Sequence, residues 1–277
     1  MFGLDLCDIL TAINFDCIEH LAKVPTDYDE AAAIFRLLQD SIRCSQTFYV
    51  EDGFCSEFVE LQRDLALAYA HLAQFETDLQ RKCCMLKNRI DILKRLLADL
   101  NPQHYLTTRR ILLFELADSF SDMKDAKENL IKLNDEMDAE EEKVSGKKRA
   151  HWIMKCNTFG LKAIAAFEDF LTTFREPPEP QGKMPERLKI EENYLSVMRA
   201  NFYMARIYSH LFDVDIKTNL QHLVRALELY QHVIHLAKVH QRLAKDVISD
   251  DLDPEVEIAK TMVELLPKKI DRIKSCL

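Results

Sequence analysis

The residues most suited to chemistry form an acidic run late in the chain, from Ser249 to Asp253. Such a run is close to the Asp-Asp-x-x-Asp pattern with which all-helical isoprenoid synthases hold magnesium and a diphosphate. That pattern works because residues four apart share one face of a helix. Here Asp253 comes one residue too early and Pro254 follows it, so we expect a polar loop that caps the next helix and no active site.

A second candidate site is a group of histidines, His222, His232, His235 and His240, on one expected helix. His232 and His235 share a face with Glu228 one turn earlier, which is a possible metal-ligand set. The Glu-x-x-His motif of di-iron helical bundles is missing, however, and histidines are common on solvated helices. The sequence therefore favours ordinary surface histidines over a metal site.

Eight cysteines are spread along the chain without a Cys-x-x-Cys pair, which makes a zinc site improbable. In a reducing compartment, isolated cysteines usually act as small buried hydrophobic residues. Cys83 and Cys84 follow Arg81 and Lys82, and neighbouring positive charge lowers a thiol pKa. We favour structural cysteines, with redox sensing by this pair as the alternative.

An apolar stripe of helical period must position many of these residues, and it runs through the first half of the chain. Its members are Phe58, Leu61, Leu65, Ala68, Leu72, Phe75, Leu79, Cys83, Leu86, Ile90, Leu93 and Leu97. A stripe of this length without Gly or Pro predicts either a coiled coil or two packed helices. Thr77 followed by Gln80 forms a capping box, in which each side chain satisfies a backbone N–H of the other. We therefore expect a helical hairpin with its break at Thr77.

The same period continues towards the C-terminus, and no segment alternates with the period of two that a half-buried strand requires. The sequence predicts an all-α fold, either a solenoid of antiparallel hairpins or a compact bundle, and we favour the α-solenoid. The expected helices are 4–22, 27–49, 55–76, 78–99, 102–121, 123–137, 147–175, 186–212, 216–246 and 254–275.

A proline-rich stretch at 176–185 is the clearest expected linker, because its residues neither continue a helix nor carry much apolar surface. It divides the chain into a helical-repeat region at 1–175 and a C-terminal helical subdomain at 186–277. The alternative is a polyproline ligand, since Pro177 and Pro180 form a minimal PxxP motif.

Composition and charge exclude several classes of protein. The net charge is −9, from 37 basic and 46 acidic residues, which disfavours nucleic-acid binding. The segment Met1–Leu21 holds no Lys or Arg, so the basic region of a signal peptide is missing. No apolar stretch is long enough to span a bilayer. We expect a cytoplasmic protein without membrane insertion.

Short segments across nearly the whole chain carry a family resemblance. They are Asp99–Leu106, Phe114–Phe120 and Asp122–Met123, with Phe75–Glu76, Arg81–Cys83, Arg89–Asp91, Ala205–Tyr208, Met262–Val263 and Leu265–Pro267 in matching order. Together they resemble the C-terminal half of the kinesin-binding protein family. The resemblance implies a tetratricopeptide-like α-solenoid that binds kinesin motor domains and blocks their association with microtubules. It also implies a cytoskeleton-associated protein with no enzyme activity and no cofactor, and it leaves other cytoskeletal partners open.

Two acidic runs are the candidate contacts for such a partner, because a kinesin presents a basic face to the acidic microtubule. The first run is Asp135, Glu136, Asp138, Glu140, Glu141 and Glu142, and the second is Asp250, Asp251, Asp253, Glu255 and Glu257. Lys147–Arg149 follows the first run, so a solvated linker in which opposite charges compact locally is the alternative.

Asp52 is a further candidate contact, in an expected loop between two helices. Its neighbour Gly53 is expected to supply a positive φ after the helix, so a purely structural role is the alternative. For the whole chain, the main rival to a motor-binding protein is a general helical-repeat adaptor that binds peptide segments of partner proteins. The two functions differ in whether the bound surface is a folded motor or an extended peptide.

Overall fold

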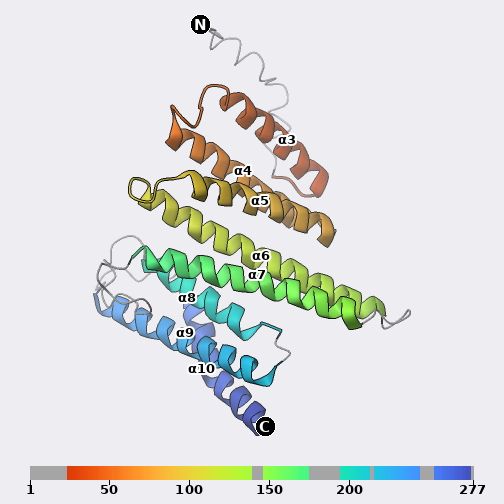
Figure 1. The fold of residues 1–277 in the computed structure, drawn as a ribbon, viewed down its shortest axis with the longest axis vertical. Coiled ribbons are helices and arrows are strands. Elements are labelled where there is room, and N and C mark those ends of the chain that lie inside the picture. Colours follow the sequence, from red (N-terminus) through yellow and green to blue (C-terminus); the bar gives the residue numbers. More distant parts are fainter. Residues whose placement is uncertain (1–23, 139–145, 175–193, 213–214, 244–252, 276–277) are drawn as a thin grey trace. The chain divides into compact units, whose positions relative to one another are not determined.

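The computed structural model describes residues 24–138, 146–174, 194–212, 215–243 and 253–275, and within these ranges the chain is helical without a strand (Figure 1). The helices are α3 (Tyr28–Ser45), α4 (Cys55–Phe75), α5 (Leu79–Asp99), α6 (Leu106–Asp138), α7 (Gly146–Thr172), α8 (Tyr194–Ser209), α9 (Ile216–Leu243) and α10 (Asp253–Lys274). The predicted all-α fold class is therefore confirmed. None of the described helices is both long and apolar enough to cross a lipid bilayer.

The chain divides into two units, Met1–Asp78 and Leu79–Leu277, and the first contains the hairpin of α3 and α4. Asp27 explains where α3 begins, because its carboxylate accepts a hydrogen bond from the N–H of Glu30 at 2.9 Å. The Glu30 carboxylate in turn accepts from the N–H of Thr26 at 2.9 Å. The first of these bonds satisfies an N–H group that the opening helical turn leaves without a backbone partner, and the second fixes the chain just before the helix. The rings of Phe35 and Tyr69, 4.8 Å apart between centroids, join the two helices.

In the second unit, α5 to α10 pack one after another in chain order. The connections 100–105 between α5 and α6 and 210–215 between α8 and α9 are short, which favours antiparallel packing within these pairs. This sequential packing of hairpins is the arrangement of an α-solenoid, as the sequence predicts. Fully buried alanines allow the helices to approach closely; they are Ala117 on α6, Ala163 on α7, Ala205 on α8 and Ala226 on α9.

The predicted break near Thr77 is confirmed, since α4 ends at Phe75 and α5 begins at Leu79. The residue directly before α5 is Asp78, so the predicted cap lies one residue too early. The predicted start of the last helix at Asp253 is also confirmed, and α10 continues through Pro267.

One helix prediction is wrong. The expected helices 102–121 and 123–137 are a single helix, α6, of 33 residues. The reason is that the segment contains no Gly or Pro, and buried Phe120, Met123 and Ala126 carry the apolar stripe straight through the expected break. The expected helix 4–22 and the expected linker 176–185 lie outside the described residues. The division into 1–175 and 186–277 therefore stays a prediction.

Candidate functional site

The most distinctive charged feature of the second unit is a row of carboxylates on α6. Asp118, Asp122 and Asp125 lie four and three residues apart, a spacing that places them on one face of the helix. Their side chains are 42%, 48% and 41% exposed. We call these three residues the α6 acidic row. The row exists because α6 runs unbroken through this segment, whereas the sequence predicted an interruption there.

A buried arginine of the neighbouring helix holds the first half of the row. Arg89 on α5 is only 5% exposed, and its Nη2 lies 3.2 Å from Oδ2 of Asp118 while its Nη1 lies 3.0 Å from Oδ2 of Asp122. Desolvation, together with the nearby charge of Asp118, raises the pKa of Asp122 to about 6 against the opposing pull of Arg89. Two carboxylates thus share one guanidinium, so the three groups carry a net charge of −1 when both carboxyls are ionised.

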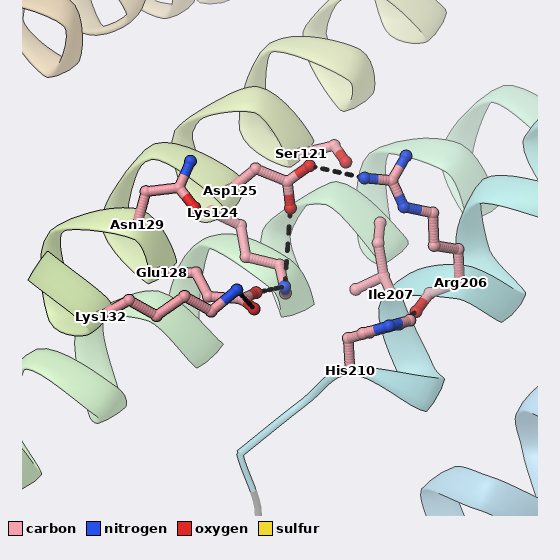
Figure 2. A pocket seen from close by; sticks show the side chains of 9 residues that line it. All are labelled: Ser121, Lys124, Asp125, Glu128, Asn129, Lys132, Arg206, Ile207 and His210. Atoms are coloured by element: carbon pink, nitrogen blue, oxygen red, sulfur yellow. Dashed lines mark hydrogen bonds and ion pairs between the residues drawn. The ribbon is translucent and has the colours of Figure 1, made fainter. Parts of the chain in front are cut away.

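The second half of the row borders a pocket of about 370 Å³ between α6 and α8 (Figure 2). Here Nζ of the buried Lys124 lies 2.9 Å from Oε2 of Glu128 and 3.7 Å from Oδ1 of Asp125. Lys132 reaches the other Glu128 oxygen at 2.9 Å. Burial opposes ionisation of Glu128, but hydrogen bonds from the two lysines outweigh it and lower the pKa of this carboxyl. Arg206 of α8 closes the network with an Nη2–Oδ2 distance of 2.8 Å to Asp125.

Helix α7 packs against the buried aliphatic stem of Lys124. A Cβ added at the buried Gly160 would lie 3.3 Å from Cδ of Lys124 and 2.9 Å from Cδ2 of Leu211, so only glycine permits this close packing. The Cys156 thiol donates to the carbonyl oxygen of Lys124 at 3.5 Å, and desolvation raises the pKa of this thiol to about 11. Such a thiol stays protonated and serves packing.

These charged groups are suited to binding a partner protein through complementary charge. Lys124, Lys132 and Arg206 are all paired with carboxylates, so the network is suited to exchanging ion pairs with a partner surface. Among the described residues, no three side chains of His, Cys, Asp or Glu gather where they could hold a metal ion.

Two predictions about chemistry can be compared with the geometry. Glu228, considered as a ligand with His232 and His235, instead pairs with Arg225, whose Nη1 lies 3.0 Å from its Oε2. Burial raises the pKa of Cys83, so its basic neighbours in the sequence do not activate this thiol.

The predicted contact residues fall into three groups. Asp52 is exposed in the loop between α3 and α4, and the positive φ predicted for Gly53 is wrong, because its backbone lies outside that region. The second group lies at helix ends, with Glu136 and Asp138 in the last turn of α6 and Asp253, Glu255 and Glu257 in the first two turns of α10. The third group lies outside the described residues; it comprises Glu140, Glu141, Glu142, Asp250 and Asp251. None of these residues is thus established as a contact with a partner protein.

The first acidic run does have one described member with a defined partner. Asp135, near the end of α6, forms a bidentate pair with Arg149 of α7, with both N–O distances at 2.9 Å. Sequence reasoning missed the α6 acidic row, although the spacing of Asp118, Asp122 and Asp125 is a readable signal. The burial of Arg89 beside it had no such signal, because it depends on how α5 packs against α6.

Comparison with known proteins places the chain in a family. The family described as KIF-1 binding protein C terminal matches residues 5–273. The KIF-binding protein of Gallus gallus is 33% identical over 279 residues, covering 100% of this chain and 43% of the relative. The KIF-binding protein of Homo sapiens is 31% identical over 271 residues, covering 98% of this chain and 40% of the relative.

A solved structure described as kinesin binding protein (KBP) aligns over 96% of this chain and 56% of its own, with 24% identity and a TM-score of 0.46. The chain spans about two fifths of the length of the curated relatives. Since the family match extends over nearly every residue, the chain belongs to the KIF-1 binding protein C-terminal family.

Proposed function

We propose that this chain binds kinesin motor domains and lowers their association with microtubules. The observation that carries the proposal is the family match over residues 5–273, together with relatives that are named KIF-binding proteins. Because the chain spans about two fifths of those relatives, the proposal concerns the contribution of this region to motor binding. The proposed activity is non-catalytic and takes place in the cytoplasm, at the microtubule cytoskeleton.

Charge gives the proposal a physical basis. A protein that binds the acidic microtubule does so through basic residues, and this chain carries a net charge of −9. Complementary charge raises the rate of encounter and orients the partners, and salt weakens both effects. The chain therefore competes with the microtubule for the same basic face of the motor.

The α6 acidic row is the part of the described surface best suited to this competition. Asp118 and Asp122 share the single guanidinium of Arg89, which leaves one carboxylate charge available to a basic partner. Asp125 pairs with Arg206, whose side chain is 51% exposed and is free to rotate away. An incoming Arg or Lys thus meets carboxylates that are fixed in place but incompletely neutralised.

The predicted residues of the first acidic run are further proposed contacts. Glu140, Glu141 and Glu142 come directly after the last described turn of α6, and Glu136 and Asp138 lie within that turn. Asp52, Asp250 and Asp251 complete the set of proposed contacts.

The test is co-sedimentation of purified kinesin motor domains with microtubules, in the presence and absence of this chain, at low and high salt. The variant Glu140→Lys/Glu141→Lys/Glu142→Lys should weaken motor binding about tenfold at low salt and flatten its salt dependence. The matched control reverses three exposed carboxylates on α4, at Glu57, Glu60 and Asp64. Equal weakening by both triple variants would assign the effect to net charge and overturn the proposed contact.

A further inference from the structure

A second surface lies in a groove of about 790 Å³ that α5, α6 and α7 form within the second unit. Helix α6 supplies much of the floor, and α5 and α7 form the two walls. The floor is apolar, with Phe120, Met123 and Ile131 nearly buried on α6. Trp152 and Phe159 add partly exposed aromatic surface from α7. We call this feature the lysine groove, because lysines line its rim.

Lysines line the rim of the groove on all three helices. They are Lys87 and Lys94 on α5, Lys127 on α6, and Lys155 and Lys162 on α7. The wall lysines lie seven residues apart on each helix, so each wall presents one lysine at every second turn. Within the described residues, no carboxylate forms an ion pair with any of the five. One carboxylate, Asp91 on α5, also lines the groove, so five positive charges face one negative charge and the groove is basic although the whole chain is acidic.

Two of these lysines also contact the aromatic residues beside them. Nζ of Lys94 lies 5.6 Å from the ring centre of Phe120, and Nζ of Lys162 lies 5.5 Å from that of Phe159. These contacts hold the ammonium groups above the apolar floor. A ligand that fills the groove therefore needs apolar groups on its inner face and carboxylates along both edges.

The length of the groove indicates the form of its ligand. Its lining on α5 extends from Gln80 to Lys94, which corresponds to roughly 20 Å at 1.5 Å per residue. That distance matches a helix of about four turns, and an amphipathic helix in an apolar groove is a common form of recognition.

The lysine groove is separate from the α6 acidic row. With about 100° between successive residues of a helix, Phe120, Met123 and Lys127 point roughly 180° away from the row. A partner in the groove and a basic partner at the row therefore contact opposite faces of α6.

We propose that the lysine groove binds an acidic amphipathic helix of a partner protein. Charge complementarity supports an acidic ligand, and the apolar floor supports an amphipathic peptide over a duplex nucleic acid or a free phosphate, whose outer surface has no apolar face to bury. The positive charges of the lining are all lysines, and it holds no arginine fork of the kind that favours bidentate recognition of phosphate. This proposal does not depend on kinesin binding, and its test contains no kinesin.

The single tryptophan of the chain, Trp152, lines the groove and provides the measurement. The probe is a synthetic helix of about 16 residues with leucines on one face and glutamates along its flanks, titrated while Trp152 fluorescence is recorded. Two further peptides serve as controls, one with the same composition in scrambled order and one with lysine in place of each glutamate. We expect a saturable change with the acidic amphipathic peptide alone.

Charge reversal at Lys87→Glu and Lys155→Glu should weaken this binding at least about fivefold at low salt. The matched control is Lys217→Glu with Lys238→Glu on α9, outside the groove, and it should leave peptide binding unchanged. The neutral pair Lys87→Gln and Lys155→Gln should give an intermediate loss, and circular dichroism verifies that each variant folds. Equal binding of the scrambled peptide, equal loss in the α9 control, or a response only to anionic lipid vesicles would overturn the proposal.

Discussion

Replacing Arg89 by Met is the sharpest test of how the second unit holds its charges. The change keeps an apolar stem of similar length but removes the cation that Asp118 and Asp122 share. Removal of one partner from a fully buried ion pair costs about 3–5 kcal/mol. Here the Arg89 side chain is 6% exposed, but the two carboxylates are 42% and 48% exposed and water still reaches them. We therefore expect a loss of about 2–3 kcal/mol in the free energy of unfolding at pH 7.5.

The loss should depend on pH in a defined direction. The pKa of Asp122 in the folded protein, about 6, lies above the value of about 3.9 for an unfolded aspartate. A carboxyl of this kind stabilises the fold most when it is protonated, and this advantage disappears as the pH rises through 6. Without Arg89, the largest opposing charge to the repulsion between Asp122 and Asp118 is lost. The loss in free energy of unfolding caused by Arg89→Met should therefore be about 1 kcal/mol smaller at pH 5 than at pH 7.5.

Urea unfolding followed by Trp152 fluorescence is the appropriate assay, because the only tryptophan lies in the second unit. The matched control is Arg225→Met, whose ion pair with Glu228 is 51% and 55% exposed and should contribute less than about 0.5 kcal/mol. A deficit for Arg89→Met below about 1 kcal/mol, or one that is equal at both pH values, would refute this reasoning.

Three further predictions concern single residues of the second unit. Gly160→Ala should lower stability by about 1 kcal/mol in urea unfolding, because crowding by Leu211 and its neighbours outweighs the higher helix propensity of alanine; an increase in stability would contradict the observed packing. In the folded protein a maleimide should label the exposed Cys84 well before Cys156, as mass spectrometry of digested peptides would reveal, and equal rates would contradict the burial of Cys156. The stability of Asp122→Asn relative to the wild type should rise by about 1 kcal/mol from pH 4 to pH 7, after allowance for solvent screening, because the wild-type carboxyl must ionise in that range. Parallel curves of stability against pH for the two proteins would exclude this linkage.

Much of the fold is readable from local patterns. The apolar stripe from Phe58 to Leu97 marks two helices, and the helix-starting residues around Thr77 locate their break to within a residue. Such features depend on residues close in sequence, which interact within a turn or two of helix. The unbroken course of α6 was not predicted, although the apolar stripe of Phe120, Met123 and Ala126 continues through the expected break.

The candidate sites were less predictable, because they depend on residues brought together by packing. Arg89 reads as one more surface arginine in the sequence, and only the packing of α5 against α6 buries it between two carboxylates. The lysine groove likewise requires Lys87 and Lys155, far apart in the chain, to lie on facing walls. Local propensity carries no information about such pairings, whereas the spacing within the α6 acidic row was available and went unused.

The central claim is tested most directly by adding the purified 277-residue chain to kinesin motor domains bound to microtubules and measuring the motor left in the pellet. The account predicts that a subset of motors moves to the supernatant, with a stronger effect at low salt than at high salt. A folded, monodisperse preparation that neither binds nor releases any motor at either salt concentration would contradict it.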